Sequence, residues 1–573
     1  MYYRFAIVWY LLLGTARSMF HKRSMGANYD EAPPDKKLRL NLASLYGTND
    51  VSGQRAAVLF RDAHNAGADH FRDLRDILPD GNASRNVSTR LLRRGKQKWP
   101  SLYYAPIRVF DRKKQAIVRS LVPFLLPHEI IHQMLLTNTV ADITSQTGLS
   151  VDTRSFMQRC SAHFSSSFVG LGLWADGVPC NWDRSQSLEV ITMYLPGLSG
   201  QNAAIRFPVV VLQKRFVAKE VTYEDIFKVL VWSFESLAVG IMPSSRHDNR
   251  SWRKGVDARR SKLAGKPILL KGILAEIRGD WAMYSSIFRL GNWKANANCC
   301  WKCNVNNKGM KDFSLQASWR TNRVSHMDFL TRLHQKGLSA SCLFDAPLFD
   351  ISIFKIDWLH CMDLGCAADW IGNVFNYILD KFPGSSASAK CSALFLKILA
   401  YYARHPELPG KYENLVVTMF RQKKKNFKLR GKASEVRGLV GFAQEIVSEM
   451  LSCNDPIEAA IIEGCRLLQE CYSCLNHSTQ YEHLPSAGRK FMLLFKSLED
   501  TTGLFRVKPK GHLLLELLEF SRDRPSDTWT YRDEEFGGTL AGYSRLRGGH
   551  ITTLSVGRKV LKAFFIHNRM PRL

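Results

Sequence analysis

The sequence predicts a mixed α/β fold in which a strand-rich centre is followed by a long helical part. Short apolar or alternating runs, bounded by turn residues, gather between residues 168 and 360, as strands do. From residue 366 to about residue 505, apolar residues recur instead at helical spacing. With 573 residues, the chain is also long enough for about three or four domain-sized units.

The charge of the chain indicates a polyanionic partner. It contains 80 Lys and Arg residues against 51 Asp and Glu residues, which gives a net charge of +29. Because neutralised phosphates release counterions, nucleic acid is the leading class of partner and an acidic membrane surface is the second. The 13 cysteines form no regular framework, which favours a reduced compartment.

The beginning of the chain allows two interpretations. An apolar run at 5–14 has the outline of a short signal peptide, and four Asn-x-Ser triplets would suit a secreted glycoprotein. Such triplets also occur by chance in nuclear and cytosolic chains. We expect residues 1–120 to form a leader and a basic, partly disordered region of mostly helical or irregular structure. Residues 121–164 should be a helical lead-in, with a helix after Pro127.

The centre of the chain predicts strands and helices in a definite order. We expect strands at 168–177, 187–195 and 206–216, a helix at 223–239, a fourth strand at 267–277 and a fifth at 350–360. Three strands in a meander, then helix, strand, helix and strand, is the order of the ribonuclease H-like fold. The first and fourth strands of that order are neighbours, so Asp176 and Asp280 at their ends should meet.

Asp280 taken alone has two interpretations. Asp is a preferred N-cap residue, and a helix pattern begins at Trp281. A carboxylate at a strand end also suits a metal-dependent site. The second interpretation gains weight because further carboxylate segments lie upstream and far downstream of Asp280.

Several segments of the chain, in this order, resemble the signatures of one protein family. They are LWADGVP at 173–179, GDWA at 279–282 with Cys300 and Cys303, DWLHCMDLG at 357–365, and KPKGHL at 508–513 followed by WTYRDEEFGG at 529–538. Together they resemble the CACTA-type DDE transposases, relatives of the Transib transposases and of the recombination-activating recombinase. The resemblance implies a ribonuclease H-like core begun by 165–365, interrupted by a helical insertion at 366–505, and closed by 506–573.

The resemblance also implies a catalytic triad of Asp176, Asp280 and a third acid. We expect Glu534 to be that acid, with Glu535 as the near alternative. Asp363 is a further candidate, because it follows the fifth strand directly. Carboxylate oxygens suit Mg²⁺ or Mn²⁺, and two such ions activate water or a 3′ hydroxyl and stabilise the leaving oxygen at a phosphodiester.

The helix that carries Glu534 should begin at Thr530. Thr530 and Asp533 have the spacing of a capping box, which predicts a helix start at this point. Glu534 would then lie in the first turn or so of the helix.

Cys300 and Cys303 have the spacing of zinc ligands. In the resembled family, two histidines from the segment before the third acid complete such a site. His512 suits one of these positions, but Glu516 stands one turn later, where the second histidine is expected. Glu516, Cys299 and His550 remain open as the fourth ligand of a structural Zn²⁺.

Two basic clusters are candidates for contact with the DNA backbone, although basic runs are also common on solvated faces. They are Lys423, Lys424 and Lys425 in the insertion, and Arg253, Lys254, Arg259 and Arg260 ahead of the fourth strand.

Two functions from different classes follow from these observations. The first is metal-dependent cleavage and transfer of DNA strands, with transposon ends and target DNA as partners. The second is a domesticated, catalytically inactive protein that binds DNA. Either function places the chain in the nucleus, unless the apolar run at 5–14 is a true signal peptide. A homodimer is compatible with both functions, and a membrane is not expected as a partner.

Overall fold

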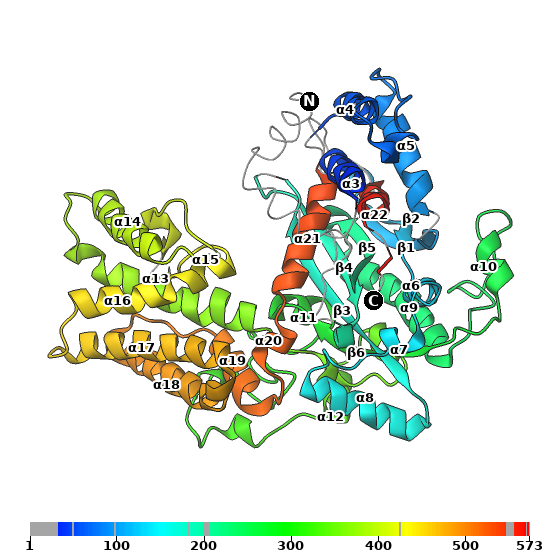
Figure 1. Cartoon of the computed structure of the whole chain (residues 1–573). Coiled ribbons are helices and arrows are strands. Elements are labelled where there is room, and N and C mark those ends of the chain that lie inside the picture. Colours follow the sequence, from blue (N-terminus) through cyan, green and yellow to red (C-terminus); the bar gives the residue numbers. More distant parts are fainter. Residues whose placement is uncertain are drawn as a thin grey trace.

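The computed structural model describes residues 33–573 apart from 48–50, 97–98, 182, 199–204, 409, 423–425, 546–554, 569 and 572. Its mixed α/β class agrees with the sequence prediction. The helices from α13 (Ala368–Ile378) to α18 (Leu484–Thr502) form a group beside the part that contains the main sheet (Figure 1). The apolar run at 5–14 lies outside the described residues.

The main sheet has four strands in the order β5-β4-β3-β6. β3 (Phe168–Pro179), β4 (Ser187–Tyr194) and β5 (Arg206–Gln213) form an antiparallel meander, and β6 (Lys271–Arg278) lies parallel to β3. The first four predicted strands are therefore present. Side chains on both faces of these strands are buried along most of their length, which explains their nearly continuous apolar sequences.

The long helix α9 (Lys219–Val239) leads from the meander towards β6 and packs against that strand. This confirms the helix predicted at 223–239. The helix ends because Gly240 follows it in the left-handed conformation, with a φ of 78°, which residues with a side chain rarely adopt.

The fifth predicted strand, at 350–360, is wrong. Ile351–Ile353 forms a short 3₁₀ turn, and only a single parallel bridge joins Phe354 to Ile277 at the edge of β6. The side chain of Asp357 accepts hydrogen bonds from the backbone N–H groups of Leu359 and His360. These bonds begin a helical segment (Leu359–Ala367) within the predicted strand, and local capping therefore prevails over the alternating sequence pattern.

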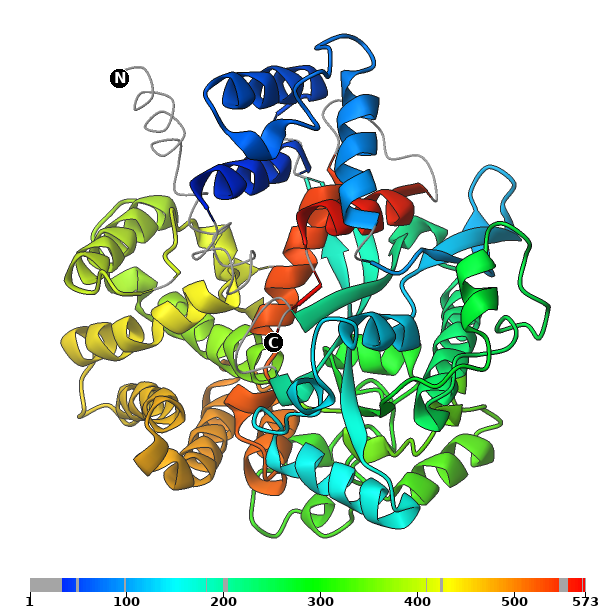
Figure 2. The same ribbon diagram turned by 45° about the vertical axis from the view of Figure 1, so that its right-hand side comes forward.

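The N-terminal region is more regular than the sequence predicts. Helices α3 (Pro34–Gly47), α4 (Gly53–Asn65) and α5 (Ala83–Lys96) share a small apolar core. This unit packs against the C-terminal helix α22 (Ser555–His567), as the adjoining blue and red helices in Figure 2 show. The first and the last described helices thus lie side by side.

A β-hairpin that the sequence analysis missed follows this unit. β1 (Tyr103–Asp111) pairs with β2 (Ala116–Phe124), so the hairpin crosses the predicted boundary at residue 120. The helix predicted after Pro127 is confirmed as α6 (Pro127–Met134), with Pro127 in its first turn.

Helix α21 (Tyr531–Ser544) packs directly against β3 (Figure 1). Gly537 permits this close approach, because a Cβ atom there would lie 2.8 Å from the ring of Trp174. One turn earlier, Asp533 accepts a 2.7 Å hydrogen bond from Nε of Arg206 in β5, and both side chains are at most 1% exposed. The helix is therefore joined to the sheet by close packing and by a buried ion pair.

The capping box expected at Thr530 and Asp533 is not formed. Thr530 is the N-cap residue of α21, but its side chain accepts no hydrogen bond from the helix. Its hydroxyl instead donates to Asp357 at 2.8 Å, and its backbone N–H donates to the same carboxylate at 3.0 Å. Asp533 pairs with Arg206 instead. Leaving a buried guanidinium without a counter-charge costs more free energy than leaving an N-cap backbone group without a side-chain acceptor.

We expect Asp533→Asn to destabilise the protein strongly. The substitution keeps the size of the side chain but leaves the buried Arg206 guanidinium without its counter-charge, which costs on the order of 3 kcal/mol. Urea unfolding followed by circular dichroism measures the loss. The matched control is Glu535→Gln, an exposed position two residues along the same helix. An Asp533→Asn protein as stable as this control would contradict the structural role of the pair.

Candidate functional site

Three acidic residues from distant parts of the chain surround one end of β3. Asp176 lies in β3, and Asp280 follows β6 directly. The two strands run parallel with Trp174 opposite Arg278, so each aspartate lies two residues beyond this pair at the same edge of the sheet. Glu534 approaches from α21, one turn before the glycine that contacts β3.

Electrostatic coupling indicates that the three carboxylates are close. Burial and then the charge of Asp280 raise the pKa of Asp176 to about 6. Burial and then the charge of Asp176 raise the pKa of Glu534 to about 8. Carboxylates that repel one another in this way are stabilised by a bound cation.

The N-cap interpretation of Asp280 is confirmed, and the cap leaves one oxygen free. Its Oδ1 accepts a 2.6 Å hydrogen bond from the backbone N–H of Met283 and caps α11 (Trp281–Ile287). The side chain is only partly buried, and the cap uses one of its two oxygens. An N-cap and a metal ligand can therefore be the same residue.

His360 and Asp357 complete the acidic site, and the sequence analysis gave neither of them a role. His360 Nδ1 lies 2.5 Å from Asp357 Oδ2, and its Nε2 lies 3.8 Å from Glu534 Oε1. Burial disfavours the protonated ring, but the hydrogen bond to Asp357 raises the pKa of His360 to about 9. The Asp-x-x-His spacing at the start of a helical segment is the signal that could have identified this pair.

The two alternatives for the third acid do not lie with the triad. Asp363 is fully buried and accepts hydrogen bonds from the hydroxyls of Tyr472 and Tyr531, so its oxygens are committed elsewhere. Glu535 is exposed on the other side of α21 from the buried Asp533. Glu534 is the acid that couples electrostatically to Asp176.

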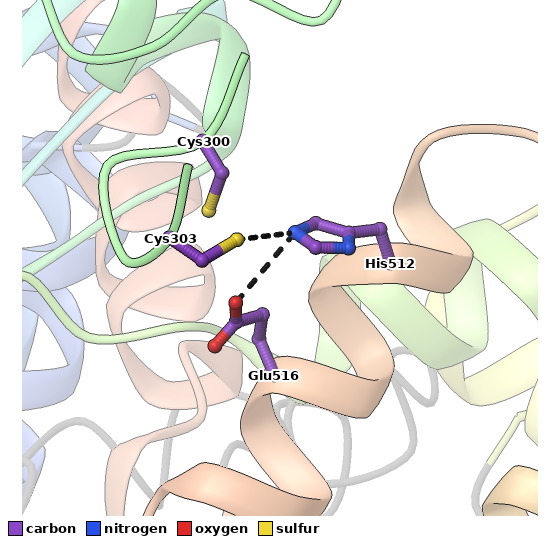
Figure 3. A group of neighbouring side chains, drawn as sticks. All are labelled: Cys300, Cys303, His512 and Glu516. Atoms are coloured by element: carbon purple, nitrogen blue, oxygen red, sulfur yellow. Dashed lines mark hydrogen bonds and ion pairs between the residues drawn. The ribbon is translucent and has the colours of Figure 1, made fainter. Parts of the chain in front are cut away.

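A second cluster brings together Cys300, Cys303, His512 and Glu516, which are all buried (Figure 3). One ligand atom from each lies within 4.8 Å of all the others, so the group could hold a metal ion. The cysteines come from the loop after α11, and the other two residues lie one turn apart on α19 (Lys510–Phe520). The convergence expected for Cys300, Cys303 and His512 is present.

Of the two candidates for the fourth ligand that the structure describes, Glu516 lies at the cluster and Cys299 does not. Oε1 of Glu516 lies 3.6 Å from His512 Nε2, while both carboxylate oxygens also accept hydrogen bonds from Arg323. The thiol of Cys299 is directed to the carbonyl oxygen of Ala295, at 3.0 Å. His550 lies outside the described residues.

The protonation of the two thiols suits metal binding. Burial disfavours the thiolate of Cys300, but hydrogen bonds from Cys303 and His512 lower its pKa well below the ordinary value. The pKa of Cys303 is raised, because its thiol hydrogen-bonds to Cys300. Metal binding would deprotonate both thiols, since thiolates are the ligands.

The residues predicted to contact DNA differ in their burial and in their ion pairs. Arg260 is wrong as a DNA contact, because its guanidinium is buried and pairs with Glu129 and Asp257. Arg253 also pairs with Asp257, and Arg259 donates a hydrogen bond to Gln133. Lys254 is exposed. Lys423, Lys424 and Lys425 lie outside the described residues.

The comparisons with known proteins indicate no function, so the function is inferred from the geometry of the site. No protein-family model matches the chain, and the comparison with curated proteins gives no match. None of the described helices has the length and apolar character that crossing a membrane requires.

We expect purified protein to contain a metal ion at the second cluster. Cys303→Ser should release the ion and destabilise the protein by on the order of several kcal/mol, because binding to a structural site contributes directly to folding. Elemental analysis and thermal unfolding measure the two effects. Cys299→Ser is the matched control, since the neighbouring thiol is equally buried but directed away from the cluster. Metal-free protein, with the two variants equally stable, would contradict the assignment.

Proposed function

We propose that the protein cleaves and joins DNA strands in a metal-dependent reaction of the CACTA transposase type. The observations that support the proposal most are that Asp176 and Asp280 follow paired positions of two parallel strands, and that the charge of Asp176 interacts with those of both Asp280 and Glu534. The strand order β5-β4-β3-β6 supports a ribonuclease H-like core. The net charge of +29 supports a nucleic-acid substrate.

The three carboxylates would hold two Mg²⁺ or Mn²⁺ ions. Such ions, when bound, lower the pKa of the attacking water or 3′ hydroxyl and stabilise the leaving oxygen. Asp176 and Asp280 are fixed by the parallel strands, and Asp280 is held further by its cap to Met283. The acids are therefore oriented before substrate arrives, which is the main contribution that a protein makes to such catalysis.

His360 has a positioning role in this proposal. Its raised pKa leaves the ring protonated at neutral pH, and it faces Glu534 from the side opposite Asp357. The positive charge favours the ionised form of Glu534, which is the form that binds a cation. Asp357 fixes the ring and also holds the start of α21 through Thr530.

We propose that the ion at the second cluster is structural Zn²⁺. Two cysteines, a histidine and a carboxylate are ligands that zinc accepts in a closed tetrahedral site. The cluster ties the loop after α11 to α19, close in sequence to the helix that carries Glu534. In this role it supports the acidic site without contacting the substrate.

The sharpest test of the reaction is Asp280→Asn. Asn caps a helix as well as Asp does, so the protein should remain folded, whereas the loss of a charged metal ligand should reduce cleavage by about 1000-fold or more. The assay measures Mg²⁺-dependent or Mn²⁺-dependent nicking and strand transfer on DNA that carries the ends of the element. Glu535→Gln, an exposed acid beside Glu534, should retain activity.

Two other results would decide against the reaction. Wild-type protein that binds DNA but never nicks it would favour the domesticated, catalytically inactive DNA-binding protein. Failure to bind DNA at low salt would contradict both functions, since both explain the positive charge by a polyanionic partner.

A further inference from the structure

A large cleft lies where the helical group meets the part of the chain that carries the sheet. Its volume is about 1080 Å³. One wall comes from residues 147–154 and the segment 524–532, and the other from helices of the insertion, including Tyr401, Arg437 and Tyr472. A cleft of this size is at the upper limit of pockets for small molecules, and therefore suits a segment of a longer ligand.

The lining of the cleft is strongly basic. It contains two acidic residues, Glu407 and Asp527, against six arginines, which are Arg154, Arg206, Arg278, Arg437, Arg524 and Arg532. Arg206 and Arg278 are paired with buried carboxylates of the sheet region. Within the described part of the chain, Arg154, Arg437 and Arg524 form no ion pair. The cleft therefore has an excess of positive charge for an anionic ligand to neutralise.

Aromatic side chains alternate with these arginines. The Arg437 guanidinium lies over the rings of Tyr472 and Trp529, with its central carbon 5.5 Å and 5.8 Å from the ring centroids. Trp529 is packed edge to face against Tyr531, and both side chains are only partly buried. Arginines interleaved with partly exposed aromatic side chains form a combination that binds phosphates together with unpaired bases.

Residues that line the cleft lie one helical turn before Glu534 of the acidic site. Trp529 and Tyr531 line the cleft, and Glu534 follows Tyr531 by one turn of α21. Asp533, between these residues and Glu534, pairs with Arg206 of the cleft lining. The cleft and the acidic site are therefore connected through the first turn of α21.

We propose that this cleft binds an unpaired nucleic-acid strand, with its phosphates at the arginines and its bases stacked on the aromatic rings near Trp529. The inference rests on the proposed function for the identification of the strand as DNA. A duplex presents only base edges to a protein, so ring faces favour a strand whose bases are free to stack. An acidic peptide would satisfy the charges but would leave the aromatic faces unused.

The test measures binding of a fluorescein-labelled oligothymidylate of about 12 nucleotides by anisotropy, without added divalent ions, over a range of salt concentrations. The full-length protein is compared with three variants. Trp529→Leu should weaken binding about tenfold through lost stacking. Arg437→Ala and Arg524→Ala should each reduce the slope of log affinity against log salt by about 0.7.

The control variant is Lys114→Ala, an exposed basic residue in the turn of the β1–β2 hairpin, outside the cleft lining. It should bind as the wild type does. Thermal unfolding of each variant checks that folding is intact. Arg524 is exposed, so its replacement should leave the fold unchanged even if Trp529→Leu does not.

A second readout locates the strand directly. Photocrosslinking to an oligonucleotide that contains 5-iododeoxyuridine should label the peptide that includes Trp529 and Tyr531. Equal effects of Arg524→Ala and Lys114→Ala, crosslinks confined to other segments, or equally tight binding of a duplex or of polyglutamate would overturn the proposal. Because neither assay requires cleavage, a protein that lacks the proposed reaction can still pass this test.

Discussion

The buried ion pair between Arg206 and Asp533 is the interaction on which the candidate site depends. It joins a strand of the meander to the helix that carries Glu534, across more than three hundred residues of chain. Either charge buried alone would be strongly destabilising, so the pair favours the orientation of the helix in which Asp533 meets Arg206. In that orientation Gly537 contacts Trp174, and Glu534 lies within the electrostatic influence of Asp176.

Two further sets of interactions fix the segments that follow the helical group, which are α19 and the start of α21. The second cluster joins α19 to the loop that follows α11, and Asp357 joins the start of α21 to the segment after the bridge with β6. Both connections link the last part of the chain to segments next to β6. The segments that carry the acids on the sheet and the acid on α21 are therefore connected to the same strand, although a long helical region lies between them in the sequence.

The sequence predicted those features that depend on local patterns. The first four strands, α9 and the convergence of Cys300, Cys303 and His512 follow from hydrophobic periodicity, ligand spacing and a family resemblance. The fifth strand was wrong because the side chain of Asp357 caps a helix within it. Periodicity describes burial but not side-chain capping, so this outcome could not be read from the pattern.

Features that depend on tertiary partners were not predictable in this way. Arg260 belongs to a basic run, yet it is buried because Glu129, far away in sequence, provides a counter-charge. Asp533 has capping-box spacing, but Arg206 attracts it more strongly than the N-cap backbone does. The role of His360 likewise depends on Glu534, which approaches from a helix at the other end of the chain.

If Asp176, Asp280 and Glu534 hold divalent ions, anomalous X-ray scattering from crystals soaked in Mn²⁺ should locate them, since Mn²⁺ prefers oxygen ligands as Mg²⁺ does. We expect manganese between Asp176 and Asp280, with a second ion reached by Glu534. Well-ordered carboxylates without manganese between them, at a concentration that saturates other sites, would contradict this expectation.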